Sequence, residues 1–213
     1  MIDCAVLVAA TVALTPAPPL KEPAPGAGHR LSSPDPLDDV RRADRAIVAT
    51  IRLRVPDWSP EADLRRGRID HLLSDIVDYE AIAHRALGAA WEPLSARQRA
   101  EFMRLFTALT NQTFVATLAR PELRLRYESE TIAGASASVF LSAVLDRPAG
   151  EVVQHLEYRL QRRADRWLIQ DVLVDHASLV DGYRDQFAHV LRSGGFDELL
   201  QRMKRKLDRS HPS

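Results

Sequence analysis

Apolar residues recur at helical spacing from about residue 36 to about residue 120, the first half of the region that is expected to fold. Between Pro36 and Val55 they fall on one face of a helix. The pattern then breaks and restarts, with Ser59 suited to cap a second helix and Pro60 suited to its first position. The spacing therefore predicts two consecutive N-terminal helices.

Two further helices are expected before residue 121. A short one spans Tyr79–Leu87 and ends at Gly88, and a long one begins after Ser95 and runs to about Leu118. The long helix carries an apolar stripe that faces inward and includes Phe102, Leu105, Phe106, Leu109 and Phe114.

After Pro121 the apolar period changes from near 3.6 to 2, which is typical of strands with one buried face. Short turns at Gly134-Ala135, Pro148–Gly150 and Ala164-Asp165 separate the alternating runs. The pattern predicts four strands in an antiparallel meander, around Leu123–Tyr127, Val139–Leu145, Leu156–Leu160 and Trp167–Val174.

From Ser178 the helical period returns, and Gly194-Gly195 separates that helix from a final one. Helices, then a curved four-stranded antiparallel sheet, then helices define the α+β class. We expect one domain over residues 35–208, preceded by an apolar and Pro/Ala-rich segment over 1–34 and followed by a tail over 209–213.

The apolar run Cys4–Leu14 has the length of a signal-peptide core rather than a membrane span. Asp3 precedes it, and no Lys or Arg does, so an apolar tail without a targeting role is the alternative. Export to the periplasm is the prediction. Cys4 is the only cysteine, so a chain processed after this run has no thiol for disulfides, thiolate catalysis or zinc.

Charge argues against a polyanion partner. The 29 basic residues balance 29 acidic ones, and the formal net charge is +0. Nucleic acid is therefore not expected as a partner. The basic run Arg202–Lys206 near the end of the chain is expected to be a solvated helical face, or a contact for anionic head groups or a partner.

The sequence contains few motifs that would indicate a catalytic or metal-binding site. Glu80 and His84 stand one helical turn apart, but no HExxH pattern or second close histidine joins them, so no metal is predicted. Asp171 and Asp175 share one face of a strand, yet a structural hydrogen bond is the expected role of Asp171. Ser178 lies outside any Gly-x-Ser-x-Gly motif and is expected to cap a helix.

Three stretches resemble the MlaC (toluene-tolerance) family, and together they cover about residues 36–207. They are Tyr79–Trp91 with Ser95–Phe102 and Leu105-Phe106, then Trp167–Val172, then Ser178–Phe187 with Gly194-Gly195 and Leu199-Leu200. Two positions depart from the family pattern: Asp175-His176-Ala177 stands where Glu-Gly-Val is usual, and Gly182 where Asn is usual. A divergent, hopanoid-associated member of the family is one interpretation of these changes.

The resemblance implies a periplasmic lipid carrier with a fold like the nuclear transport factor two cone, without enzymatic activity or cofactor. Such proteins shuttle phospholipid between an inner-membrane ABC transporter complex and an outer-membrane partner, which maintains outer-membrane lipid asymmetry. A monomer is expected.

A lipid carrier needs an enclosed apolar cavity. Exposing an acyl tail to water costs about 0.8 kcal/mol per methylene, so a tail of about sixteen carbons costs on the order of 12 kcal/mol. Apolar residues on the inner faces of the sheet and helices are the predicted lining, although each also suits an ordinary core. They are Phe106, Leu109, Tyr127, Leu141, Leu156, Tyr158, Leu160, Tyr183 and Phe187.

Three alternatives remain open from the sequence. Arg184 is a possible head-group contact, or it forms an ion pair with Asp181 or Asp185. A small-molecule isomerase or hydrolase on the same kind of fold would use His155 or Asp171. A protein that only docks partners would have a filled core without a cavity.

Overall fold

A computed structural model describes residues 35–53, 55–56, 59–148 and 150–209 of the chain. The predicted apolar segment and linker over residues 1–34 therefore lie outside the described residues. In chain order the elements are α1 (Pro36–Ile51), α2 (Pro60–Ile76), α3 (Tyr79–Leu87), the short 3-10 helix η2 (Gly88–Ala90), α4 (Ala96–Leu118), β1 (Leu123–Ala133), β2 (Ser136–Arg147), β3 (Gly150–Arg163), β4 (Arg166–Val174), β5 (Ala177–Ser178) and α5 (Leu179–Arg209).

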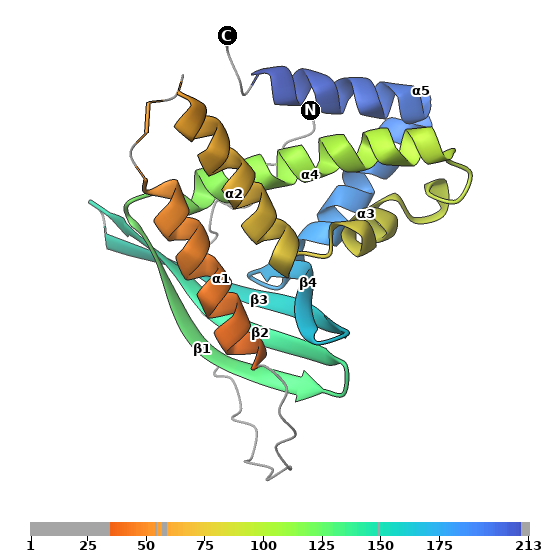
Figure 1. Ribbon diagram of the computed structural model, residues 1–213. Coiled ribbons are helices and arrows are strands. Elements are labelled where there is room, and N and C mark those ends of the chain that lie inside the picture. Colours follow the sequence, from red (N-terminus) through yellow and green to blue (C-terminus); the bar gives the residue numbers. More distant parts are fainter. Residues whose placement is uncertain (1–34, 54, 57–58, 149, 210–213) are drawn as a thin grey trace.

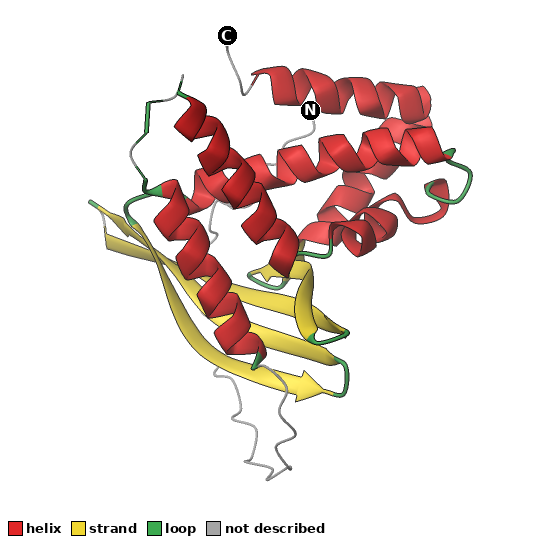
Figure 2. Cartoon of the chain, in the orientation of Figure 1, coloured by secondary structure: helices red, strands yellow, loops and turns green. Residues whose placement is uncertain are grey.

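The helices gather on one side of a single curved sheet (Figures 1 and 2). Helix α1 lies along β1 and β2, whereas α3, α4 and α5 form a second group toward β4. The order of helices, antiparallel sheet and C-terminal helix confirms the predicted α+β class.

Side-chain caps fix where the helices begin. The hydroxyl of Ser59 accepts a hydrogen bond from the amide of Ala62, as its predicted capping role requires. Ser95 and Gln98 form a reciprocal capping box at the start of α4. These bonds satisfy amide groups that the first turn of a helix leaves without backbone partners.

Glycine ends or bends helices at the two predicted places. Gly88 has φ 54° directly after α3, a conformation that costs little only without a Cβ. Gly195 has φ 72° inside α5 and separates two helical runs at the predicted Gly194-Gly195 break.

The sheet is an antiparallel meander in the order β1-β2-β3-β4-β5. Its register puts Leu125 beside Ala143, Leu141 beside Leu156, and Tyr158 beside Val172, all on the face toward the helices. The opposite face carries charged side chains such as that of Arg124, whose guanidinium pairs with Asp146 at 2.8 Å and Glu151 at 2.7 Å.

The prediction of four strands was wrong by one short strand. Asp175 and His176, with φ 47° and 71°, reverse the chain so that Ala177 and Ser178 pair with Val174 and Leu173. A strand of two residues has no periodicity to detect, which is why the pattern did not reveal it. The departure at His176 from the usual glycine thus falls in a turn that does require positive φ.

Two β-bulges change the direction of individual side chains. Glu128 is the extra residue of β1, because Tyr127 pairs with Leu141 and Ser129 with Phe140. Beyond this bulge Glu130 lies opposite Val139 and accepts a 2.8 Å hydrogen bond from the Leu37 amide at the start of α1. A carboxylate is thereby brought to the positive end of that helix.

The second bulge, at Gln170, lies between the pairs Arg159–Asp171 and Leu160–Ile169. Its side-chain amide donates to Asp78, the cap of α3, and its carbonyl accepts from Arg85 on the same helix. The bulge therefore joins the outer strand to α3.

The two long edges of the sheet differ. Strand β4 is partly covered by β5 and by a parallel bridge from Val77 to Ile169. Strand β1 lies at the other end of the strand order, with Arg124 and Arg126 exposed and the bulge at Glu128. Within the described ranges, no helix is long and apolar enough to cross a membrane.

Candidate functional site

A small apolar pocket lies between the last turns of α4 and the inner face of the sheet. Its volume is about 40 Å³. The lining comes from α4, the following turn and strands β1 to β4: Phe114, Thr117, Leu118, Arg120, Leu123, Leu125, Ala143, Leu145, Gln154, Leu156, Tyr158 and Val172. We call it the first pocket.

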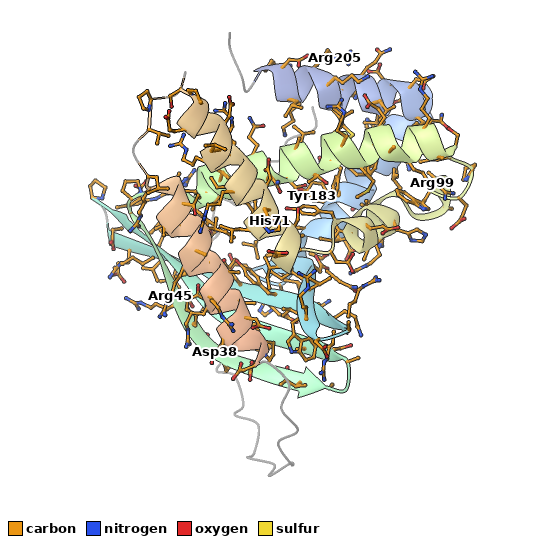
Figure 3. The ribbon with its side chains drawn as sticks, in the orientation of Figure 1. Asp38, Arg45, His71, Arg99, Tyr183 and Arg205 are labelled. Carbon is orange, nitrogen blue, oxygen red and sulfur yellow. The ribbon has the colours of Figure 1, made fainter. Side chains whose placement is uncertain are left out.

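A second pocket of about 30 Å³ lies farther along the same face of α4, next to α3 and the start of α5. It is lined by Val77, Ile82, Thr110, Thr113, Phe114, Ile169, Asp171, Val172, Leu179, Val180 and Tyr183. Figure 3 labels Tyr183 among the helices beneath α4.

Phe114 and Val172 line both pockets, so their side chains form the partition between them. Phe114 is half-buried on α4, and Val172 is buried on β4. Removing the Phe114 ring from this position would enlarge the apolar space next to both pockets.

Threonine hydroxyls do not make this face of α4 polar. The hydroxyl of Thr113 donates to the Leu109 carbonyl and that of Thr117 to the Thr113 carbonyl, each at 2.9 Å. Because these hydroxyls are satisfied by the preceding turn of their own helix, the methyl groups are available to the pockets.

The opposite face of α4 borders a larger and more open groove of about 540 Å³. It is lined by Ile51, Arg65, Arg66, Ile69, Asp70, Ala108, Asn111, Gln112, Val115, Ala116, Ala119 and Leu207. Polar groups lie in this groove, since the side-chain amide of Asn111 donates to Asp70 at 2.7 Å and its oxygen accepts from the Tyr79 hydroxyl. We call it the helix groove.

The family model described as MlaC protein matches residues 44–205. The chain belongs to the MlaC family. Among solved structures, it is similar to a phospholipid-binding protein from Ralstonia solanacearum, determined in complex with a phospholipid. The two chains share 22% identity with a TM-score of 0.62, over 82% of this chain and 98% of that one, which shows a common fold. No curated protein in the comparison matches the chain.

Three of the predicted lining residues of this MlaC-family chain border the two pockets. Leu156 and Tyr158 line the first pocket, and Tyr183 lines the second. Leu109 and Leu141 are buried in the core nearby. Leu160 is also buried, and it borders a separate, polar hollow beside Arg85 and Arg159.

The predicted residues Phe106 and Phe187 belong to a filled aromatic cluster between α4 and α5. The Phe106 ring lies 5.5 Å from that of Tyr183 and 6.3 Å from that of Phe187, and Phe102 stacks on Phe106 at 5.6 Å. These rings hold the two helices together, since centroid distances of about 4.5–7 Å are those of packed aromatic pairs.

Tyr127, another predicted lining residue, donates a 2.8 Å hydrogen bond to Asp44 on α1. Burial raises the pKa of Asp44 to about 6, and the Tyr127 hydrogen bond only partly opposes this rise. The buried Tyr158 hydroxyl has its pKa raised by burial and by the same carboxylate. An acid that resists ionisation thus lies where α1 meets the sheet.

The candidates for acid–base chemistry have structural roles. Asp171 accepts hydrogen bonds from the Ser178 hydroxyl at 2.7 Å and the Val180 amide at 3.3 Å, and Arg85 approaches it at 3.5 Å. Ser178 in turn accepts from the Asp181 amide, which confirms its predicted role as a helix cap. These bonds fix the start of α5 against β4.

Asp175 and His155 are not brought to Asp171. Asp175 lies in the exposed turn after β4, where its carboxylate accepts from the backbone amide of His155. His155 itself is exposed on β3, opposite Ser142 on the outer face. The predicted enzyme candidates therefore do not form a pair.

Arg184 and the basic run near the end of the chain are engaged in ion pairs. Arg184 lies 3.0 Å from Asp181 and also donates to the Arg85 carbonyl. Arg202 and Arg205 pair with Glu198, and Lys204 lies 2.9 Å from Glu101. Figure 3 shows Arg205 on the last part of α5, away from Tyr183 near the start of the same helix.

No cluster of three or more His, Cys, Asp or Glu side chains able to hold a metal is found in the described part of the chain. His84 lies 3.3 Å from Glu92 rather than forming a site with Glu80, and its ring packs edge-on against Trp91.

Sequence reasoning placed Phe114 on the inward stripe of α4, but it missed the threonines beside Phe114 and one end of the first pocket. Thr110, Thr113, Phe114, Thr117 and Leu118 follow helical spacing and form the sheet-facing stripe of α4. The threonines of this stripe were missed because their hydroxyls read as polar, and only the structure shows that those of Thr113 and Thr117 are bonded to the backbone. Gln154 and Arg120 carry no apolar signal.

Proposed function

We propose that this protein is a periplasmic carrier that holds phospholipid acyl tails between the inner face of the sheet and α4. The observation that carries the proposal is a pair of largely apolar pockets that share Phe114 and Val172 in their linings. Membership of the MlaC family and the fold shared with a phospholipid-binding protein support it.

The two pockets must widen to accept a tail. At about 40 and 30 Å³ they are far smaller than the roughly 300–1,000 Å³ typical of ligand sites. The half-buried ring of Phe114 is the first element that must move, because it lines both spaces and its displacement breaks no strand pairing, and the helices must then move away from the sheet. The burial of lipid methylenes supplies the driving force.

Photo-crosslinking tests this location. A benzophenone amino acid placed at Phe114 should crosslink to diacyl phospholipid when the protein is purified from a lysate that contains membranes. The same amino acid at Ala116, on the groove side of α4, should crosslink far less. Preferential crosslinking at Ala116 would place the tails in the helix groove instead.

Native mass spectrometry of the unmodified protein tests the class of function. A bound mass near that of a diacyl lipid is expected. Protein that carries no lipid after exposure to phospholipid vesicles would instead support a partner-docking role with a filled core.

Transport between membranes is the finer part of the proposal. We infer that the carrier moves lipid between an inner-membrane ABC transporter and an outer-membrane partner, and thereby supports lipid asymmetry and tolerance of solvents such as toluene. The apolar run Cys4–Leu14 would direct export. Periplasmic recovery of the full chain after cell fractionation, and transfer of labelled phospholipid between vesicles, are the expected results.

A further inference from the structure

Two polar side chains lie in the otherwise apolar lining of the first pocket at the end where α4 stops. Arg120 follows the last residues of α4 and precedes Pro121, and Gln154 lies on the inner face of β3 opposite Ala143. Both line the same pocket. Convergent polar groups at one end of an apolar pocket are the usual sign of a site that orients a ligand.

The backbone holds Arg120 in place. Its amide donates to the Thr117 carbonyl at 3.3 Å, and its own carbonyl accepts from the Leu123 amide at 3.2 Å. The base of the side chain is thus fixed between the end of α4 and the start of β1. The half-buried guanidinium can then be presented to the pocket without reorganisation of the chain.

Neither group has a protein partner. Among the residues that the structure describes, the Arg120 guanidinium makes no hydrogen bond or ion pair, and the same holds for the amide of Gln154. By contrast, Arg85, beside the separate polar hollow, is bonded to Asp171, and Arg184 is bonded to Asp181. Gln154 is only 8% exposed, and its side-chain amide has hydrogen-bonding capacity that a ligand oxygen or water can use.

We propose that Arg120 and Gln154 bind the phosphate diester of the lipid at the mouth of the first pocket, with the tails directed toward Phe114. The planar guanidinium offers two parallel donors to phosphate oxygens, and the amide adds a third donor for a phosphate or ester oxygen. This inference rests on the proposed carrier function and identifies the group by which the lipid is recognised.

The chemistry selects for the phosphate and not for the head-group alcohol. Phospholipids with different head groups should therefore bind alike, whereas neutral lipids with the same tails should bind more weakly. A hopanoid that carries no phosphate would gain nothing from Arg120. The site accordingly separates the phospholipid interpretation from the hopanoid one.

A purely structural role for Arg120 is the competing explanation. A cation just beyond α4 interacts favourably with the negative end of the helix, whether or not lipid is present. In that case, loss of the charge lowers the stability of the lipid-free protein but does not change the preference among lipids.

The test compares phosphatidylglycerol with diacylglycerol of identical, fluorescently labelled tails. Dissociation constants are measured for the full chain and for Arg120→Gln, Arg120→Lys and Gln154→Leu, with thermal unfolding of each lipid-free variant. Arg97→Gln is the matched control, because Arg97 is exposed at the opposite end of α4 and its loss changes the net charge equally.

Arg120→Gln should weaken phosphatidylglycerol binding by about tenfold or more and leave diacylglycerol binding unchanged. Gln154→Leu should act in the same direction with a smaller factor, Arg120→Lys should recover part of the loss, and Arg97→Gln should change neither constant. Equal effects on both lipids, no effect on either, or loss of the preference in Arg184→Gln instead would overturn the phosphate site. If the unmodified chain binds neither lipid, the carrier proposal itself fails.

Discussion

The two sides of α4 differ in how their space is organised. On the sheet side, two pockets of about 40 and 30 Å³ are lined mainly by apolar side chains, with Arg120, Gln154 and Asp171 among them, and the hydroxyls of Thr113 and Thr117 are bonded within the helix. On the other side, a groove of about 540 Å³ contains Asp70, Asn111 and Gln112. The larger space is thus the more polar and the more open one.

This difference shows that volume alone does not identify a lipid site. A hydrocarbon chain gains free energy by leaving water, so dry and enclosed walls matter more than the space available before loading. The open groove, whose lining includes Arg65, Arg66 and Asp70, provides less of this gain. The narrow side becomes a site only if one ring can move, and the predictions below test that asymmetry.

The largest expected effect is on the free energy of unfolding. It is tested by comparing alanine substitutions of Phe187, in the aromatic cluster, and of Phe114, in the partition. Phe187→Ala should lower the free energy of unfolding by about 3–5 kcal/mol, since it leaves a cavity among packed rings. Phe114→Ala should cost less, because that ring is half-exposed and already borders two pockets.

Urea unfolding with and without phospholipid separates these two variants. Lipid should restore a larger share of the lost stability to Phe114→Ala, because the enlarged apolar space binds the tail only in the folded state. Equal restoration in both would show that Phe114 is ordinary core.

A second prediction concerns how stability depends on pH through Asp44, the buried acid on α1. The pKa of Asp44 rises from 3.8 to about 6 on folding, so the folded state binds its proton more tightly than the unfolded chain does. Its contribution to stability is therefore present below about pH 4 and is lost as the pH rises to about 6, by roughly 2–3 kcal/mol. Asp44→Asn should remove this decline.

Asp70→Asn, on the groove side, is the control for that experiment. It should leave the decline between pH 4 and 6 in place, because Asp44 and its Tyr127 partner are untouched. Chemical unfolding at a series of pH values measures both variants. If stability declines as strongly in Asp44→Asn as in the unmodified protein, the decline comes from other acids. Glu130 is one of these, because burial and the neighbouring Asp35 raise its pKa to about 7.

A third prediction compares the same change, alanine to leucine, at one position on each side of α4. Ala143→Leu fills the first pocket, and Ala116→Leu adds the same atoms to the helix groove. Lipid affinity should fall about tenfold, or about 1.4 kcal/mol, in Ala143→Leu and stay within about twofold in Ala116→Leu. The reverse order in a vesicle-extraction assay would move the tails to the groove.

The smallest expected effect is in the turn that joins β4 to β5, beside the second pocket. His176 has φ 71°, which strains a residue with a Cβ. His176→Gly should raise the free energy of unfolding by about 0.5–1 kcal/mol and leave lipid affinity unchanged. Ala177→Gly, at a neighbouring position without positive φ, should instead lower stability in thermal unfolding.

The sequence was sufficient where structure follows from local chemistry. Ser59 and Ser95 as caps, Gly88 and Gly195 as breaks, and the alternation along the first four strands were all predictable, because each depends on a few adjacent residues. The MlaC resemblance was also visible in the sequence, and the family match over residues 44–205 confirms it.

The parts that the sequence did not predict depend on pairing between distant segments. The bulges at Glu128 and Gln170 exist only relative to the partner strand, and β5 is too short to have a period. Period alone also cannot distinguish residues that pack in an aromatic cluster, as Phe106 and Phe187 do, from residues that line a hollow. Arg120 reads as a turn residue until the fold brings it to the pocket.

The free edge of β1 has a consequence for how copies of this protein behave together. Arginines at positions 124 and 126 and the irregular backbone at Glu128 make that edge a poor template for a strand from another molecule. β5 and the Val77 bridge hinder the same kind of addition along β4. Strand-by-strand growth into fibres is therefore discouraged from either margin of the sheet that the structure describes.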